Sequence, residues 1–363
     1  MKIQRLFLRN VRNIKELDLD FRDPVTGKPM SRIVLAGANG SGKTTILECI
    51  FGLMAAAERY GKREINRYSK LQDIEIALPV SSQLQLLFDL EFIGAPPVTL
   101  SVGYGEQVPI RSEATVAEEV SVGGLLPPPG SFTFSQPLQL TSLFTRLTEF
   151  VQQAREREES AFGSILYFPH NRYLPLVPEG ELRVEPSEYQ WAYRYSAKDE
   201  WKGSTESYLF SLNYLDLEDR DKRIPAHRFE QAVELVNSVL DGKRIAHVQK
   251  GRIVVETDKG ETHGLDDLSS GEKQLVLLLI EIQRRIAPSS IVLIDEPEIS
   301  LHPAWQRGLM AALDKIIEQY DAQVILATHS LEIATSVMPH EVISLNDLGL
   351  PLGKWEPEKE ALA

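Results

Sequence analysis

A glycine-rich run near the start of the chain constrains the fold more than any other segment: Gly-Ala-Asn-Gly-Ser-Gly-Lys-Thr, at Gly37–Thr44. It follows the short apolar stretch Ile33–Leu35, and apolar residues then recur at helical spacing from Ile46 to Met54. Strand, glycine loop and helix in that order are what the phosphate-binding pattern G-x-x-x-x-G-K-[ST] requires. The order therefore favours a phosphate-binding loop over a glycine-rich turn that binds nothing.

The residue types in this loop suit a nucleoside triphosphate. Gly40 and Gly42 permit backbone conformations in which successive N–H groups point at the phosphates, and the helix that starts near Gly42 adds the positive end of its dipole. We expect Lys43 to contact the β- and γ-phosphates and the Thr44 hydroxyl to ligate Mg²⁺. The nucleotide-binding residues predicted in this segment are Asn39, Gly40, Ser41, Gly42, Lys43, Thr44 and Thr45. The predicted cofactors are ATP and Mg²⁺.

A second candidate site stands at the end of a buried strand. The apolar run Ile291–Ile294 ends in Asp295 and Glu296, and ligands bind at the carboxyl ends of strands in α/β sheets. We expect Asp295 to hold Mg²⁺ and Glu296 to orient or deprotonate an attacking water as general base. The alternative, a solvated strand terminus, is the weaker interpretation in a chain that also carries the phosphate-binding loop.

The hydrophobic pattern predicts an α/β fold. Alternating residues predict antiparallel strands over 2–9, 16–21 and within 81–105. From Leu268 onward, helices and strands alternate, which favours a largely parallel sheet. The elements predicted there are a helix at 271–285, a strand at 291–294, a helix at 303–320 and a strand at 323–327. The expected fold is a nucleotide-binding domain with a mixed central sheet, an antiparallel β flank and a partly helical insertion.

The same pattern suggests how the chain is divided. Residues 1–105 and 263–363 are expected to form the two parts of one nucleotide-binding lobe, and residues 106–262 an inserted subdomain. Within the insertion, the stretch 106–137 is rich in Gly, Pro and Ser and predicts a long loop. The other elements predicted there are a helix at 141–162, a strand at 165–168, a mostly helical stretch at 206–240 and a hairpin at 244–256.

Composition narrows the class of protein. The chain has 363 residues, of which 43% are apolar and 25% charged, as in ordinary globular proteins. Its net charge of −13 argues against a dedicated nucleic-acid binder. Two basic clusters nevertheless leave local DNA contact open. They are Arg59, Lys62, Arg63, Arg67 and Lys70, and Lys243, Arg244, Lys250 and Arg252.

Cysteine use and the apolar runs bear on location. Cys49 is the only cysteine, so no internal disulfide can form. The N-terminus lacks the pattern of a signal peptide, and the longest strictly apolar run, Leu275–Ile280, is too short to cross a bilayer. We therefore expect a soluble, cytoplasmic protein without a membrane partner.

Five separated segments resemble the ABC-type ATPases of the SMC, RecF and OLD group. The segments are Lys2–Asn13, Gly37–Thr44, Leu268–Gln274, Asp295–Pro303 and Thr328–Ser330. They are similar, in that order, to the first hairpin of the group, the Walker A loop, the ABC signature, the Walker B strand with its D-loop, and the histidine switch. The resemblance implies an ABC-type P-loop fold and ATP hydrolysis.

This resemblance also implies roles for four further residues. Arg12 is expected to approach the nucleotide, and His329 to contact the γ-phosphate and help orient water. Ser269 and Gly271 belong to the signature, where Ser270 replaces the usual glycine. In this group the signature acts in trans, which implies a homodimer that sandwiches two ATP molecules between the phosphate loop of one subunit and Ser269 of the other.

Other features of the group do not transfer. The glutamine that senses Mg²⁺ and the γ-phosphate has no clear position: Gln85, Gln136 and the segment Tyr167–Arg172 are candidates. No long coiled coil is present, which disfavours SMC-type tethering. Only about thirty residues follow His329, so we expect no nuclease domain like that of OLD proteins.

Three functions remain open from the sequence. The leading hypothesis is a dimerising ATPase switch that controls a separately encoded effector, a nuclease or toxin, in defence against phage. A RecF-like ATPase that binds DNA in repair is the second. The nucleotide-binding subunit of a membrane transporter is the third, and the opening hairpin and the Leu-His-Pro after Walker B disfavour it.

Overall fold

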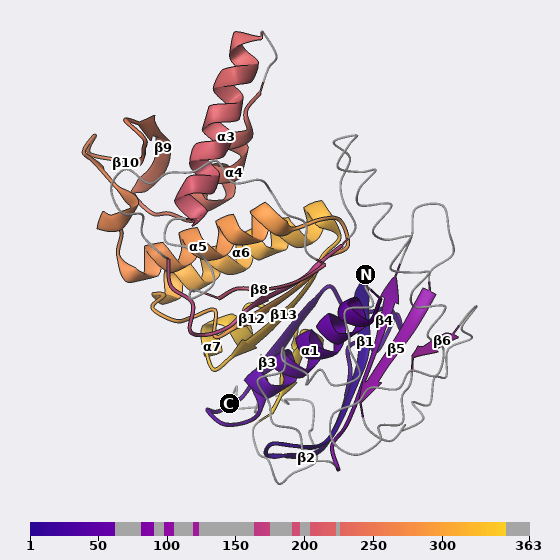
Figure 1. Cartoon of the computed structure of the whole chain (residues 1–363). Coiled ribbons are helices and arrows are strands. Elements are labelled where there is room, and N and C mark those ends of the chain that lie inside the picture. Colours follow the sequence, from indigo (N-terminus) through magenta and orange to yellow (C-terminus); the bar gives the residue numbers. More distant parts are fainter. Residues whose placement is uncertain are drawn as a thin grey trace, which may run out of the picture.

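A six-stranded parallel sheet forms the centre of the computed structural model (Figure 1). The structure describes residues 1–61, 81–90, 98–104, 119–122, 163–174, 191–196, 204–222 and 226–345. The strand order in this sheet is β14-β3-β13-β12-β7-β8. The strands are β3 (Arg32–Ala36), β7 (Ile165–Phe168), β8 (Ala192–Arg194), β12 (Ile291–Asp295), β13 (Gln323–Thr328) and β14 (Val342–Ser344). Every pair in the order is parallel.

The central strands are buried on both faces, because successive side chains point to opposite sides of a sheet. On β12, Ile291 and Leu293 belong to one hydrophobic cluster, whereas Val292 and Ile294 belong to another. The continuous apolar run of this strand therefore contributes to two cores, as expected for a parallel sheet covered on both faces.

Helix α1 (Lys43–Gly61) packs against one face of this sheet. Its apolar residues Ile46, Ile50 and Met54 are fully buried with Ile291 and Leu293. A second sheet lies beyond α1, so that the helix is enclosed between two sheets (Figure 1). The glycine loop thus leads into a helix that is held from both sides.

That second sheet is mainly antiparallel, in the order β2-β1-β4-β5-β6. Its strands are β1 (Lys2–Val11), β2 (Ile14–Asp20), β4 (Gln83–Leu90), β5 (Val98–Tyr104) and β6 (Glu119–Val122). A hairpin joins β1 to β2, and β5 and β6 run parallel. The hairpin turn at residues 12–13 reaches the glycine loop.

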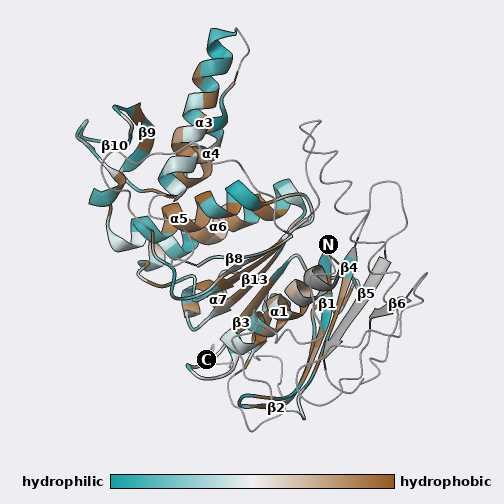
Figure 2. Ribbon diagram, in the orientation of Figure 1, coloured by the Kyte–Doolittle hydropathy of each residue, from teal (hydrophilic) through white to brown (hydrophobic). Residues whose placement is uncertain are grey.

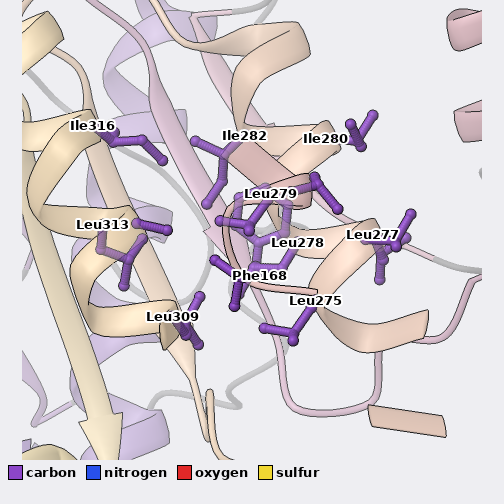
Figure 3. Close-up of a cluster of buried hydrophobic side chains, with 14 of the residues drawn as sticks. Phe168, Leu275, Leu277, Leu278, Leu279, Ile280, Ile282, Leu309, Leu313 and Ile316 are labelled. Atoms are coloured by element: carbon purple, nitrogen blue, oxygen red, sulfur yellow. The ribbon is translucent and has the colours of Figure 1, made fainter. Parts of the chain in front are cut away.

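Helices α5 (Ser270–Arg285) and α6 (Pro303–Tyr320) cover the other face of the central sheet. In Figure 3, the side chains of Leu309, Leu313 and Ile316 point from α6 toward α5, which presents Leu275, Leu279 and Ile282. Both sets follow the spacing i, i+4, i+7, the stripe of a helix face. The two helices therefore pack along matching apolar stripes, with Phe168 of β7 beneath them.

A smaller lobe stands beside α5. It contains α3 (Ser204–Asp221), α4 (Arg228–Asn237) and a three-stranded sheet of β9 (Lys243–Gln249), β10 (Arg252–Thr257) and β11 (Thr262–His263). Helix α3 projects away from the central sheet, and its far end is hydrophilic (Figure 2). The remaining elements are α7 (Leu331–Thr335) and two short 3₁₀ helices, η1 (Leu265–Asp267) and η2 (Pro339–Glu341).

The predicted α/β class, antiparallel flank and helical elements are confirmed, with one correction. The central sheet is parallel throughout and not mixed, because the antiparallel strands form separate sheets. The segment 106–262 supplies β7 and β8 to this sheet as well as the smaller lobe. The long loop at 106–137, apart from β6, and the helix at 141–162 lie outside the described residues.

The helices also bear on whether the chain could span a membrane. Among the described residues, none of the helices is both long enough and apolar enough to cross a bilayer.

Truncating Leu279 to alanine should lower the free energy of unfolding by about 2–5 kcal/mol, because a fully buried leucine leaves a cavity between α5 and α6. The shift in the midpoint of urea denaturation measures this loss. Val25→Ala is the control, since Val25 is 91% exposed. Equal midpoints for the two variants would contradict this packing of α5 against α6.

Candidate functional site

The glycine loop connects β3 to α1 at the carboxyl edge of the central sheet. Its start is fixed by the neighbouring strand, because the Gly37 N–H donates to the Thr328 carbonyl at 3.3 Å. Gly40 and Gly42 have φ angles of +81° and +96°, in the region that favours glycine. A Cβ at position 42 would also lie 3.2 Å from Ile14 Cδ1. The loop therefore has the backbone form of an anion-binding nest at the start of a helix.

Lys43 lies across this loop. Its Nζ donates to the carbonyls of Gly37 and Ala38 at 2.6 and 2.8 Å, and the residue is 5% exposed. Burial lowers the pKa of Lys43, and the nearby carboxylates of Glu296, Asp295 and Glu298 act in the opposite direction. The ammonium group is thus held where the loop curves, beside three acidic side chains.

Thr44 and Asp295 join the loop to the acidic strand end. The Thr44 hydroxyl donates to Asp295 Oδ2 at 2.9 Å and to Oδ1 at 3.2 Å. Asp295 is fully buried, and burial raises the pKa of its carboxyl group despite the hydrogen bonds from Thr44 and His170. A hydroxyl and a buried carboxylate are hard oxygen donors of the kind that Mg²⁺ prefers. The residues present therefore fit a magnesium ion beside the phosphate loop.

Glu296 follows directly and adopts a left-handed backbone conformation, with φ of +47°. Its N–H donates to the Ala327 carbonyl at 2.8 Å, and its own carbonyl accepts from Arg172 at 2.9 Å. Within the described part of the chain, no hydrogen bond engages its half-buried carboxylate. Two hydrogen bonds therefore hold the backbone of Glu296, while its carboxylate remains available to a ligand.

His329 follows β13 and pairs with a second glutamate. Glu298 Oε1 accepts from the His329 N–H at 2.8 Å and lies 3.1 Å from His329 Nδ1. The Glu298 side chain is 6% exposed and that of His329 is 48% exposed. Glu298 therefore holds one ring nitrogen of His329 from the protein side, which leaves the other, Nε2, for a ligand.

Arg172 is a buried residue that holds the backbone around Asp295 and Glu296. It is 4% exposed, and its guanidinium donates to the carbonyls of Pro169, Asp295 and Glu296 at 3.0, 2.6 and 2.9 Å. Burial lowers the pKa of Arg172 to about 10. Its own carbonyl accepts from Gln274 of α5 at 2.9 Å. One buried cation thus connects the end of β7, the Asp295–Glu296 turn and α5.

The signature residues lie at the start of α5. Ser269 caps the helix: its Oγ accepts from the Glu272 N–H at 3.3 Å, and Glu272 Oε2 accepts from the Ser269 N–H at 2.7 Å. Lys243 of β9 holds the same carboxylate at 2.9 Å. Ser269 is exposed, and among the described residues its side chain bonds to Glu272 alone. This helix start therefore faces solvent on the smaller-lobe side of the molecule.

Close packing explains why position 271 is occupied by glycine. A Cβ at this position would lie 2.5 Å from the Ser300 carbonyl oxygen and 2.8 Å from the Trp305 ring. The start of α5 therefore packs against the loop between β12 and α6, and a larger residue at 271 would separate them. The glycine is buried within its own chain, whereas the prediction assigned it to nucleotide contact.

Arg12 and Asn13 sit in the hairpin turn above the loop. Arg12 Nη1 donates to Thr45 Oγ1 at 3.1 Å and lies 3.0 Å from Glu48 Oε2. Asn13 Nδ2 donates to the Gly40 carbonyl at 2.7 Å. The turn thus contacts both the loop and the first turns of α1.

The structure brings most of the predicted residues to one edge. Those that lie together at the carboxyl ends of β3, β12 and β13, or in the turn above them, are Arg12, Asn39, Gly40, Ser41, Gly42, Lys43, Thr44, Thr45, Asp295, Glu296 and His329. Asn39 and Gly40 are exposed at the loop tip, and Ser41 is buried. Ser269 and Gly271 stand apart, at the start of α5.

Sequence reasoning missed several contacts. Asn13, Glu298 and Gln274 lie inside segments with a recognisable pattern, but nothing in the sequence shows their pairing partners. Lys243 and Arg244, from one of the two basic clusters, pair with Glu272 and Glu256. The other basic cluster falls largely outside the described residues.

The candidates for the sensor glutamine differ in where they lie. Gln136 lies outside the described residues, and Gln85 lies within β4, opposite Phe7 of β1. The segment Tyr167–Arg172 does reach the site, where His170 Nδ1 lies 3.2 Å from Asp295 Oδ2. A histidine, and no glutamine, is therefore the side chain that this strand end brings to Asp295.

Two protein-family models match the chain. One, described as "AAA domain, putative AbiEii toxin, Type IV TA system", matches residues 169–335. The other, described as "AAA domain", matches residues 5–121. The first match contains Asp295, Glu296 and His329, and the second contains the glycine loop.

The chain is also similar to individual proteins. The chain is 24% identical to "Retron Vc95 probable ATPase" of Vibrio cholerae over 364 residues, which covers 89% of this chain and 70% of the relative. It is 31% identical to "Retron Ec83 probable ATPase" of Escherichia coli over 112 residues, covering 28% of this chain and 20% of that one. An SMC head domain from Thermotoga maritima aligns at 15% identity with a TM-score of 0.47, over 95% of this chain and 94% of the other.

The family matches agree with the geometry of the site. A glycine loop, an acidic strand end and a histidine lie on adjacent parallel strands, and the two AAA-domain models cover these elements between them. The chain is therefore similar to the ABC-type P-loop ATPases of the SMC, RecF and OLD-like group, and the two AAA-domain matches and the retron ATPase support that resemblance.

Proposed function

We propose that this protein is an ATP-hydrolysing molecular switch that closes as a homodimer. The observation that carries the proposal is the 2.9 Å contact between Thr44 and Asp295, which joins the phosphate loop to the acidic strand end. Glu296 and His329 lie at the same edge of the sheet. The side chains proposed to bind the phosphates, the cation and the attacking water thus lie together at the carboxyl edge of the central sheet.

Each residue has a task that its position supports. The loop N–H groups and Lys43 bind the phosphates, and Thr44 and Asp295 hold Mg²⁺. When bound, Mg²⁺ neutralises charge on the phosphate oxygens. Glu296 accepts the proton of the attacking water. The Nε2 of His329 contacts the γ-phosphate, because Glu298 holds Nδ1 from behind.

The dimer is supported by the exposure of Ser269 at the start of α5. Among the described residues, the Ser269 side chain bonds only to Glu272 and to no residue of the phosphate loop of its own chain. A helix start offers free N–H groups and the positive end of its dipole to an anion. Two copies related by a two-fold axis would each complete the other's site.

The biological setting is supported by the comparisons. Similarity to two proteins named as retron probable ATPases and to the AAA-domain family described as "putative AbiEii toxin, Type IV TA system" supports a role in anti-phage defence. In this role the cytoplasmic dimer would control an effector protein, a nuclease or toxin, through the smaller lobe. A DNA-binding function is less well supported, because Lys243 and Arg244 are neutralised by Glu272 and Glu256.

Lys43→Ala should reduce ATP turnover by about 100-fold or more, because the site loses a preorganised cation that contacts the phosphates. Steady-state phosphate release measures the effect. Lys259→Ala, at an exposed lysine in the β10–β11 turn, is the control and should retain full activity. Normal turnover in the Lys43 variant would refute the site assignment.

Glu296→Gln should slow hydrolysis by about 100- to 10,000-fold, the range for loss of a general base. The variant should still bind ATP and should therefore accumulate as a dimer, seen by light scattering after gel filtration. Glu318→Gln changes an exposed glutamate of α6 and should behave as wild type. A Glu296 variant that hydrolyses ATP normally would remove the general-base role.

Ser269→Arg should impair hydrolysis while ATP binding to the monomer stays intact, because within its own chain the change removes only the cap of α5, and it places charge and bulk on the surface offered to the second copy. Calorimetric ATP titration and a turnover assay separate the two. Ser81→Arg, at an exposed serine before β4, controls for added charge and bulk. Full activity in the Ser269 variant would argue against a composite site.

A further inference from the structure

One contact at the site has no part in the proposed hydrolysis: that between His170 and Asp295. His170 Nδ1 lies 3.2 Å from Asp295 Oδ2, the oxygen that also accepts from Thr44 at 2.9 Å. The His170 side chain is 54% exposed, whereas Asp295 is fully buried, so the imidazole remains accessible from solvent. A hydroxyl and an imidazole therefore both approach one carboxylate oxygen, which makes three potential cation ligands in one place.

We propose that His170 supplies an imidazole nitrogen to the divalent cation that is bound with the nucleotide at Thr44 and Asp295. This inference rests on the proposed function, since it assumes that nucleotide and cation bind at this edge. It adds to that function a nitrogen ligand in a place where oxygen donors alone were expected.

The spacing of the donor atoms supports the proposal. Ligands at about 2.0–2.1 Å from an octahedral cation lie about 3 Å from their neighbours in the coordination sphere. The separations of 2.9 Å for Thr44 and 3.2 Å for His170 from Asp295 Oδ2 match that spacing. A cation bound at Asp295 Oδ2 would therefore have the Thr44 hydroxyl and the His170 ring as the nearest further side-chain donors.

The position of His170 is fixed by the backbone on both sides. β7 pairs with β12 so that Phe168 lies opposite Ile294, which places the next residues of the two strands at the same edge. Arg172 holds the Pro169 carbonyl and the Asp295 carbonyl with one guanidinium group. The loop that carries His170 is therefore tied directly to the residue that it faces.

The cation would depend on the nucleotide for its remaining ligands. Across the described ranges, no group of three or more His, Cys, Asp or Glu side chains could hold a metal ion unaided. Phosphate oxygens and water would complete the coordination sphere, as is usual for Mg²⁺ sites in nucleotide-binding proteins. The cation should therefore bind together with ADP or ATP, and weakly without them.

A nitrogen ligand has consequences for metal choice. Mg²⁺ prefers oxygen ligands in a strict octahedron, whereas imidazole suits first-row transition metals better. Removing the imidazole should therefore weaken Mn²⁺ binding more than Mg²⁺ binding. We expect Mn²⁺ affinity in the presence of ADP to fall about tenfold or more in His170→Gln, the size of effect seen for single groups around metal sites.

Electron spin-echo spectroscopy of the full chain with Mn²⁺ and a non-hydrolysable ATP analogue tests the ligand directly. The wild-type protein should show coupling of Mn²⁺ to an imidazole nitrogen, and the coupling should change when histidine alone carries the heavy nitrogen isotope. His170→Gln should abolish it. His227→Gln is the matched control, because His227 pairs with Glu230 at 2.9 Å on an exposed surface of the smaller lobe, and this variant should keep the signal.

Phosphorus coupling in the same spectra separates the two proposals. Phosphorus coupling without histidine nitrogen coupling in the wild type would overturn the ligand role of His170 and leave the nucleotide site intact. A nitrogen signal that persists in the His170 variant would overturn that ligand role as well. Failure of Mn²⁺ and nucleotide to bind at all would refute the proposed function too.

Discussion

The parallel pairing of β3, β13, β12 and β7 is the constraint on which the site depends. Because these strands run in the same direction, their carboxyl ends meet at one edge, and each is followed by a functional segment. The glycine loop follows β3, His329 follows β13, Asp295 ends β12 and His170 follows β7. Parallel pairing thus brings residues separated by up to about 290 positions in the chain to the same edge of the sheet.

The carboxyl edge of the central sheet also carries buried charges of both signs. Asp295 and Glu298 are buried carboxylates, and burying an ionised carboxylate is costly unless cations or hydrogen bonds compensate. Lys43 and Arg172 are the buried cations beside them. Arg172 directs its donors to three backbone carbonyls, so its charge acts on the carboxylates through space. A bound divalent cation would add the compensation that Asp295 still lacks.

The sequence predicted the parts of the site that are contiguous in the chain. The glycine loop, the acidic strand end and the order of βα elements each have a local signature, and the structure places them as that signature requires. Contacts between distant segments were not predictable, because a single sequence does not show which side chains face each other. His170, Arg172 and Glu298 owe their importance to such contacts. The alternation of helices and strands correctly predicted a largely parallel sheet, but the description of the central sheet as mixed was wrong, since hydrophobic alternation shows that antiparallel strands exist but not which sheet they join.

The central claim is that the phosphate loop of one copy works with Ser269 of another. Mixing two inactive variants, Lys43→Ala and Ser269→Arg, tests it most directly. A mixed dimer would contain one site with both Lys43 and Ser269 intact, so the mixture should regain ATP hydrolysis that neither variant shows alone. If the mixture stays as inactive as its components while mixed dimers are shown to form, each site lies within one chain and the composite site is wrong.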